Sequence, residues 1–367
     1  MKYMRVALVY DRVNKWGGAE RVLLALHELF PDADLYTSVY HKEKAKWAKV
    51  FSIIPSFLQD FPFAKNSHEF FPLLMPAAFE SFNFDKYEVV ISITSEAAKG
   101  IITKPQTLHI CYCLTPTRYL WSGYEEYFSG RLAKILSFPA ISYLKRWDKV
   151  ASSRPDEFIA ISKEVQKRVK RFYNRNPEII HPPVALIESD LAQKDLNKKG
   201  DYYLVVSRLV RYKRIDLAIL ACNKLNIRLK IAGAGSELER LKMIAGPTVE
   251  FVGSVSDMEL ISLYSRAKGL LFPGAEDFGI VMVEALGFGT PVIAYGKGGA
   301  LDIVENGKSG ILFPHQTVES LVKAIKKAEK INFVIKDLKE RAKYFSASLF
   351  KQKIKMYIEQ SLQKKKI

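Results

Sequence analysis

Residues 269–286 read Gly269-Leu-Leu-Phe-Pro-Gly-Ala-Glu276-Asp-Phe-Gly-Ile-Val-Met-Val-Glu284-Ala-Leu286. The apolar run at the start is typical of a strand buried on both faces of a parallel sheet, and residues 280–286 predict the helix behind it. Glu276 then lies in the strand-to-helix loop. Open α/β sheets bind ligands at the loops that follow the carboxyl ends of their strands, so this loop is a candidate binding site.

A second carboxylate, Glu284, follows Glu276 at a spacing that matters for a helix. Eight residues at 3.6 residues per turn return a side chain to within about 80° of the same face. One carboxylate is then available for a sugar hydroxyl and the other for a ribose hydroxyl. The alternative is an acid at the helix N-terminus followed by a solvated helix glutamate.

The same alternation of short apolar runs and helical patterns extends along the chain and predicts two parallel, doubly wound α/β domains. A polar stretch that follows His181-Pro-Pro-Val184 separates them. We expect an N-terminal domain at 1–183, a linker at 184–200, a C-terminal domain at 201–346, and a final helix at 347–367 that packs back toward the N-terminal domain. Strands are expected at 4–10, 35–39, 89–93, 109–113, 157–161, 202–206, 229–232, 249–252, 269–272 and 291–294.

Composition narrows the class of protein. The 367 residues carry a formal charge of +17, which suits nucleic acid, anionic lipid or a phosphorylated substrate. Cys111, Cys113 and Cys222 lack metal-ligand spacing and indicate reduced thiols. No apolar stretch is long enough to span a bilayer, and the N-terminus leads into a strand rather than a signal sequence. We therefore expect a cytoplasmic protein, either soluble or resting on a membrane surface.

Four loops at the ends of expected strands have donors suited to phosphate. Glycines allow backbone N–H groups to approach an anion, and a guanidinium beside an ammonium can hold a diphosphate. Ordinary tight turns and a solvated basic loop remain the alternatives. The loops contain Gly17-Gly18, Arg208 with Lys213, Gly233-Ala-Gly235, and Gly296-Lys-Gly-Gly299.

Taken together, these motifs resemble family-4 retaining glycosyltransferases of the GT-B fold, from Met4 to about Phe350. That resemblance implies two Rossmann-like domains that face a central cleft. The first half, with Cys111-Tyr-Cys-Leu-Thr-Pro-Thr-Arg-Tyr-Leu-Trp121, is similar to the mannosyltransferase-like branch that builds bacterial surface polysaccharides. The motifs are Gly17-Gly-Ala-Glu20, Arg208-Leu-x-x-x-Lys213, Gly233-x-Gly235, Glu276-x7-Glu284 and Gly289-Thr-Pro-Val-Ile-Ala294.

The resemblance also implies a reaction. A hexose, with mannose favoured, would move with retention and without metal from a GDP-sugar or UDP-sugar to a glycan or a polyprenyl-diphosphate-linked acceptor, in the synthesis of surface polysaccharide or lipopolysaccharide. No cofactor is expected. The chain would work in the cytoplasm, at or near the inner face of the membrane.

Roles for individual residues follow from the resemblance. Arg208 and Lys213 would clamp the diphosphate, Glu276 would bind the donor sugar, and Glu284 would bind the ribose. Asp277, Phe278 and Gly279 would offer backbone N–H groups beside Ile280, and Gly17 and Gly18 would close on the donor from the other domain. Gly233, Gly235, Gly253 and Val255 would line the base, and Asp11 and Arg118 would contact the acceptor.

Two positions depart from the branch. Leu114 and Ser95 stand where that branch usually has histidine. A retaining, front-side transfer needs no protein base, because the leaving phosphate can take the acceptor proton. The alternative is a non-catalytic or degenerate protein that binds sugar nucleotides or glycans. A nucleic-acid binder is supported by charge alone.

Three further expectations concern metal binding, the membrane and the C-terminal segment. The histidines at 27, 41, 68, 109, 181 and 315 are dispersed, so we expect no metal site. Arg131–Trp147 mixes cations with large apolar residues, as a segment lying on a membrane does, with Pro139 interrupting a single helix; a core helix pair is the alternative. The basic helical stretch Ala347–Gln363 is either a packed helix or a frayed, solvated tail.

Overall fold

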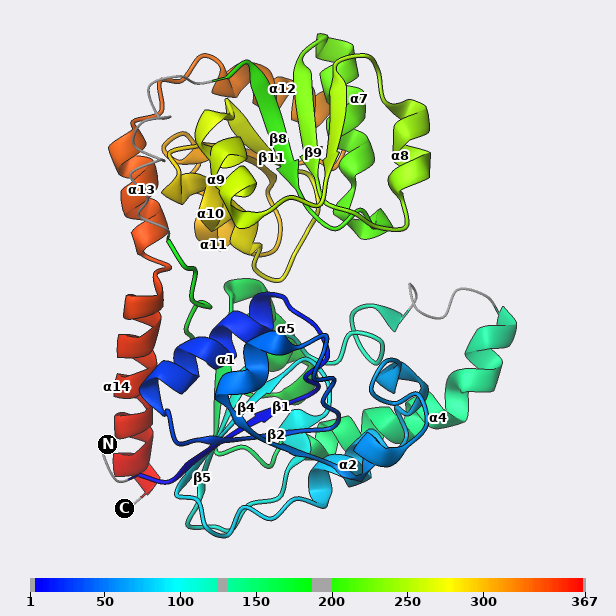
Figure 1. Ribbon diagram of the computed structural model, residues 1–367, viewed down its shortest axis with the longest axis vertical. Coiled ribbons are helices and arrows are strands. Elements are labelled where there is room, and N and C mark those ends of the chain that lie inside the picture. The colour runs from blue at the N-terminus through cyan, green and yellow to red at the C-terminus, as the bar shows by residue number, and fades with distance from the viewer. Residues whose placement is uncertain (1–3, 125–130, 187–199, 366–367) are drawn as a thin grey trace. The chain divides into compact units, whose positions relative to one another are not determined.

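The computed structural model describes residues 4–124, 131–186 and 200–365 (Figure 1). The chain divides into two compact units: unit 1 comprises Met1–Pro183 and Ser348–Ile367, and unit 2 comprises Val184–Ala347. The expected linker lies mostly at 187–199, outside the described residues. Each unit is an open parallel sheet with helices on both faces, so the expected α/β fold with two Rossmann-like domains is confirmed.

Unit 1 contains a seven-stranded sheet in the order β3-β2-β1-β4-β5-β6-β7. Every pair of neighbouring strands is parallel. Its strands are β1 (Val6–Tyr10), β2 (Asp34–Thr37), β3 (Ser52–Pro55), β4 (Val89–Thr94), β5 (Leu108–Cys113), β6 (Glu157–Ala160) and β7 (Glu178–Ile179), and its helices are α1 (Gly18–Leu29), α2 (Met75–Glu80), α4 (Arg131–Ala151), α5 (Lys163–Tyr173) and α14 (Ala347–Lys365).

Unit 2 contains a six-stranded parallel sheet in the order β10-β9-β8-β11-β12-β13. Helices α7, α8 and α12 enclose an apolar core on one face of it, and α9, α10 and α13 cover the other face (Figure 1). Its elements are β8 (Tyr202–Val206), β9 (Arg228–Ala232), β10 (Val249–Gly253), β11 (Gly269–Phe272), β12 (Val292–Tyr295), β13 (Gly310–Phe313), α7 (Ile215–Leu225), α8 (Leu238–Ile244), α9 (Asp257–Arg266), α10 (Ile280–Gly287), α11 (Ala300–Ile303), α12 (Val318–Ala328) and α13 (Ile335–Lys343).

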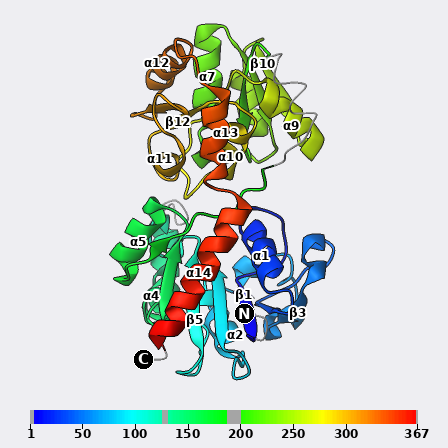
Figure 2. The ribbon, with the colours of Figure 1, turned by 90° about the vertical axis from the view of Figure 1, so that its left-hand side faces the viewer.

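The last helix, α14, returns to unit 1 and lies across its sheet between α1 and α5 (Figure 2). The ring of Phe350 meets Tyr112 of β5 edge to face, with 5.9 Å between centroids, and the Tyr357 hydroxyl donates to the Glu157 carboxylate over 3.0 Å. Lys351 pairs with Glu28 of α1 at 2.5 Å. The described part of this helix is therefore a packed element of unit 1 and not a frayed tail.

Helix α4 corrects one expectation. Pro139 lies inside a continuous helix and does not divide it. Proline removes one helical hydrogen bond and crowds the preceding turn, at a cost of about 3 kcal/mol. Packing of the following residues offsets that cost, because Ile141 and Leu144 are buried with Leu120, and the Trp147 indole donates to Glu80 over 2.7 Å.

Candidate functional site

The strand order of unit 2 reverses between β8 and β11. The chain runs outward from β8 through β9 to β10, and then returns to β11 on the other side of β8. The loops that follow β8 and β11 therefore run in opposite directions along the sheet. Doubly wound sheets bind ligands in the crevice between two loops of this kind. Arg208 and Lys213 follow β8 and Glu276 follows β11, so the three residues expected to be catalytic flank this point.

The loop after β8, which carries Arg208 and Lys213, is fixed in place by the buried residue Leu209. Leu209 is fully buried, and its backbone N–H donates to the carbonyl of Ala234 over 2.9 Å. Arg208 is exposed and donates to the Tyr212 hydroxyl over 2.9 Å. The Lys213 ammonium lies 5.2 Å from the centre of the Tyr212 ring. Tyr212 therefore contacts both Arg208 and Lys213.

Lys213 and Glu276 form an ion pair between the two loops. The Lys213 side chain is 11% exposed and the Glu276 side chain 21%, so solvent screens this pair less than it screens a surface pair. Gly274 permits the approach, since a Cβ there would lie 3.0 Å from the Lys213 backbone. The pair leaves a cation and a carboxylate side by side at the point of strand reversal.

The loop after β12 supports Glu276 from its other side. Gly299 donates its N–H to the Glu276 carbonyl over 2.8 Å, and a Cβ at Gly298 would lie 2.2 Å from that same oxygen. The glycines at 298 and 299, which the sequence indicated as phosphate donors, are thus required by backbone contact. They fix the position of the Glu276 main chain.

The start of α10 presents backbone donors. Gly279 caps this helix in the left-handed region, with φ of 95° and no side-chain cap. Among the N–H groups of the first helical turn, that of Met282 donates to the Gly279 carbonyl over 3.0 Å. A helix N-terminus favours an anion at this end. Phe278 is buried and meets Phe345 at 5.7 Å between ring centroids, which fixes the loop below Asp277 and Ile280.

Glu284 lies on α10 and is half-buried. Its carboxylate accepts from the Tyr264 hydroxyl over 2.9 Å, and the Tyr264 ring stacks on Phe288 at 5.8 Å. The expected ribose contact would use this carboxylate.

The four residues expected to line the base lie at or just after the carboxyl ends of β9 and β10. Gly233 has φ of 132°, and a Cβ there would lie 1.9 Å from the Ser207 carbonyl; at Gly235 the distance would be 2.3 Å from the Leu209 carbonyl. These two glycines therefore pack against the Arg208 loop. Gly253 has open space around its Cβ direction, and Val255 is half-buried.

The remaining expected residues lie in unit 1. Gly17 caps α1 and Gly18 begins it, and Glu20, buried beside them, accepts from the Tyr10 hydroxyl over 2.7 Å. Arg118 is half-buried. Leu114 follows β5 and donates its N–H to the Thr94 carbonyl over 2.8 Å.

Asp11 has a different environment from the one expected of an acceptor-binding residue. Its carboxylate is fully buried and accepts from the Thr94 hydroxyl, from the N–H groups of Ser95, Ala97 and Ala98, and from the Ser95 hydroxyl over 3.3 Å. A carboxylate with five donors and no exposed surface has no capacity left for a sugar hydroxyl. We therefore assign Asp11 to holding the loop after β4.

Sequence reasoning missed Glu96, which lies where the strand order of unit 1 reverses between β1 and β4. Its carboxylate pairs with Arg12 at 3.1 Å and accepts from the Tyr119 hydroxyl at 3.1 Å. Burial raises the pKa of Glu96, although Arg12 acts to lower it. The contact joins residues 84 positions apart, and its signal in the sequence was the position of Glu96 in the loop that follows an expected strand.

The described residues contain no group of three or more His, Cys, Asp or Glu side chains that could hold a metal ion. They also contain no helix long and apolar enough to cross a membrane.

A family model described as glycosyl transferases group 1 matches residues 187–346, nearly the whole of unit 2. Unit 2 is thus similar to group 1 glycosyltransferases. Three curated relatives support this at low identity. The chain is 27% identical over 209 residues to an uncharacterized glycosyltransferase of Methanocaldococcus jannaschii, covering 54% of this chain and 58% of the relative.

The other two relatives have stated activities. The GtfA subunit of a UDP-N-acetylglucosamine–peptide N-acetylglucosaminyltransferase from Streptococcus pneumoniae is 26% identical, over 67% of this chain and 50% of its own length. Mouse alpha-1,3/1,6-mannosyltransferase ALG2 is 30% identical, over 52% of this chain and 54% of its own length. The matches span about half the length of these relatives.

Solved structures match both units. Anabaena HepE in complex with UDP has a TM-score of 0.71 at 18% identity, covering 97% of this chain and all of that chain. Sucrose-phosphate synthase from Thermosynechococcus elongatus gives 0.71 at 18%, covering 97% and 98%. WaaG, a glycosyltransferase of lipopolysaccharide biosynthesis, gives 0.65 at 15%, covering 95% and 98%. These likenesses show the GT-B fold.

Proposed function

We propose that this protein is a retaining, metal-independent hexosyltransferase that uses a nucleoside-diphosphate sugar. The observation that carries the proposal is the Lys213–Glu276 pair at the point of strand reversal in unit 2. In the proposed reaction the bond between the anomeric carbon and the β-phosphate breaks, and the acceptor oxygen bonds to the same face of that carbon. The leaving diphosphate takes the acceptor proton.

The residues have distinct parts in this reaction. Arg208 and Lys213 stabilise the negative charge that grows on the diphosphate, and the N–H groups at the start of α10 add to that field. Glu276 binds hydroxyls of the donor sugar, and Glu284 binds the ribose. When the diphosphate arrives, Lys213 exchanges part of its contact with Glu276 for a phosphate oxygen, which frees a carboxylate oxygen for the sugar.

Mannose from GDP-mannose is the donor that we favour. The motifs of the N-terminal half support it, together with the relation to a mannosyltransferase. The relation to an N-acetylglucosaminyltransferase and the likeness to a UDP-binding structure support a UDP-sugar instead. A surface glycan or a polyprenyl-diphosphate-linked glycan is the proposed acceptor, and the likeness to WaaG is in keeping with it.

An exposed apolar surface in unit 1 would suit a lipid-linked acceptor at a membrane. Ile135, Leu136 and Phe138, which precede Pro139 in α4, are 61%, 73% and 65% exposed. Large apolar side chains beside cations are what an interfacial helix presents to anionic lipid. We expect Leu136→Asp with Phe138→Asp to abolish flotation with vesicles containing anionic lipid. Val150→Asp, a change at the far end of α4, serves as the matched control; flotation unchanged in the double variant would contradict the assignment.

A second candidate, a degenerate sugar-nucleotide-binding protein, is favoured by Leu114 and Ser95. Leu114 places an apolar side chain after β5, and the Ser95 side chain is engaged by the buried Asp11. A thermal-shift experiment with GDP, UDP, ADP and their sugar conjugates, without added metal, tests the proposed donor class. A ligand at a hundred times its Kd stabilises by about 2.7 kcal/mol. We expect one base to be selected and the shift to be lost in Arg208→Ala. A shift without turnover of any sugar conjugate would favour the binding protein.

A further inference from the structure

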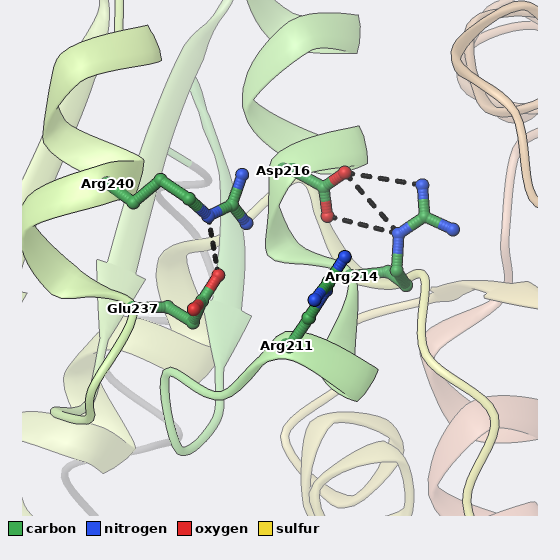
Figure 3. Close-up of a pocket in the computed structure, with 5 residues that line it drawn as sticks. All are labelled: Arg211, Arg214, Asp216, Glu237 and Arg240. Carbon is green, nitrogen blue, oxygen red and sulfur yellow. Dashed lines mark hydrogen bonds and ion pairs between the residues drawn. The ribbon is translucent and has the colours of Figure 1, made fainter. Parts of the chain in front are cut away.

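Unit 2 has a charged hollow of about 520 Å³ on the side of the Arg208 loop next to α8 (Figure 3). Five charged residues line it: Arg211, Arg214, Asp216, Glu237 and Arg240. Neither Lys213 nor Glu276 is among them. We propose that this hollow binds a sugar phosphate, and the proposal does not depend on the transfer reaction.

The cations of the hollow come from three elements. Arg211 begins the short 3-10 turn at 211–213, Arg214 caps α7, and Arg240 lies on α8. Figure 3 shows Arg211 between the other two guanidinium groups. Guanidinium groups that converge from separate elements suit a phosphate, because each can bind its oxygens in a bidentate manner.

Two of the three guanidinium groups already have carboxylate partners. Arg214 contacts Asp216 at 3.2 Å, and Arg240 contacts Glu237 at 2.5 Å. Within the described parts of the chain, Arg211 has no acidic partner. The hollow thus carries one uncompensated positive charge, and a phosphate at Arg211 would neutralise it.

The backbone of Arg214 supports the assignment. Its φ of 52° lies in the left-handed region. Residues other than glycine, asparagine and aspartate adopt this backbone conformation at a cost of about 1 kcal/mol or more in conformational free energy. The α7 helix that it caps has no side-chain cap at this end. An arginine at a position that glycine would occupy without strain places its guanidinium at the rim of the hollow.

The two carboxylates of the hollow, Asp216 and Glu237, indicate a ligand that carries hydroxyl groups as well as a phosphate. Asp216 and Glu237 are 19% and 20% exposed and would repel a phosphate placed directly on them, whereas carboxylates bind sugar hydroxyls well. A volume of about 520 Å³ also exceeds what one phosphate fills and lies in the range of small-molecule pockets. Phosphate on Arg211 with hydroxyls on Asp216 and Glu237 satisfies both kinds of group.

Isothermal titration of the full chain with glucose 6-phosphate, inorganic phosphate and glucose, at matched ionic strength, tests the proposal. We expect saturable binding of glucose 6-phosphate, weaker binding of inorganic phosphate and none of glucose. Arg211→Gln should weaken glucose 6-phosphate at least tenfold. Arg266→Gln removes the same charge from an exposed position of unit 2 outside the hollow and should leave binding unchanged.

Two more variants separate this site from the proposed donor site. Lys213→Ala should retain glucose 6-phosphate, and Glu237→Gln should weaken glucose 6-phosphate while it strengthens inorganic phosphate. Equal loss in Arg211→Gln and Arg266→Gln, or loss in Lys213→Ala, would overturn the site. Equal affinity for glucose 6-phosphate and inorganic phosphate would overturn the sugar part of the proposal.

Discussion

Lys213 and Glu276 pair at the point where the strand order of unit 2 reverses, and each is held by its own loop. Gly274 brings the two loops together, and the Gly299 N–H fixes the Glu276 carbonyl. A resting ion pair of this kind keeps a cation ready for phosphate without leaving it uncompensated in a partly buried place.

The pair predicts that binding and turnover respond differently to Glu276→Gln. Without the carboxylate, Lys213 is free for the diphosphate, so the Kd for the preferred nucleoside diphosphate should stay equal or fall. Transfer should drop by about 100-fold or more, because the donor sugar loses a charged partner. Calorimetry and initial rates measure the two effects. A large loss of nucleotide affinity would mean that Glu276 does not compete for Lys213.

Gly235→Ala should displace the loop after β8, which carries Arg208. The new methyl group would lie 2.3 Å from the Leu209 carbonyl, so the loop that carries Arg208 must shift. We expect a loss of about 1–3 kcal/mol in the free energy of unfolding, with weaker nucleotide binding. Gly296→Ala is the matched control, because its Cβ would meet its nearest neighbour at an ordinary 3.4 Å. Equal behaviour of the two variants in denaturant titration would refute this reading.

A buried ion pair in unit 1 should be costly to break. Lys99 and Asp148 lie 2.5 Å apart with side chains 2% and 1% exposed. Burial acts to lower the pKa of Lys99, but Asp148 outweighs it and the pKa is raised. Lys99→Met leaves the carboxylate buried with donors from Trp121 and Tyr173, and should cost about 3–5 kcal/mol.

The control for this variant is Lys104→Met. Lys104 pairs with Asp85 at 2.8 Å, but both side chains are more than half exposed, so its loss should cost about 1 kcal/mol or less. Chemical denaturation at neutral pH compares the two. Similar losses would show that the buried pair contributes no more than a surface pair.

His109 should make unit 1 sensitive to mild acid. Burial lowers its pKa to about 3, with Lys365, Arg154 and Arg175 acting in the same direction and Asp156 opposing. His109 binds a proton near pH 6.5 in the unfolded chain but only near pH 3 in the folded chain. The free energy of unfolding therefore falls as pH drops from about 6.5 toward 3. The slope reaches about 1.4 kcal/mol per pH unit for this group.

Denaturant titrations between pH 7 and pH 5 test the role of His109. His109→Gln should flatten the loss of stability, whereas His315→Gln, at an exposed site, should not. His68, whose pKa burial also lowers to about 3, should leave a residual slope in the His109 variant. An unchanged slope in His109→Gln would contradict the assignment.

The sequence predicted strands that are buried at every position, such as β4 and β11, because burial on both faces favours a mostly apolar composition. It missed β13, an edge strand of four residues, although three of them are buried. It also missed β3, which is exposed or half-buried at every position, and β7, which has two residues. A pattern that rests on burial has little to detect at such edges.

For the candidate site, the sequence indicated Arg208, Lys213 and Glu276 through their places after strands. It did not show that Asp11 is enclosed by five donors or that Glu96 meets Arg12. Both facts depend on contacts between segments more than 80 residues apart. The sequence also could not predict the backbone contacts of Gly233 and Gly235. A loop glycine gives the same sequence pattern whether a ligand or another segment of the chain packs against it.

The most direct test of the central claim is kcat/KM for sugar transfer by wild type and Arg208→Ala with the donor that the thermal shift selects. Loss of one contact to the developing charge costs about 3–4 kcal/mol at the transition state. We predict a fall in kcat/KM of at least several hundredfold, with the fold intact by circular dichroism. A variant that keeps near-normal kcat/KM would contradict the account.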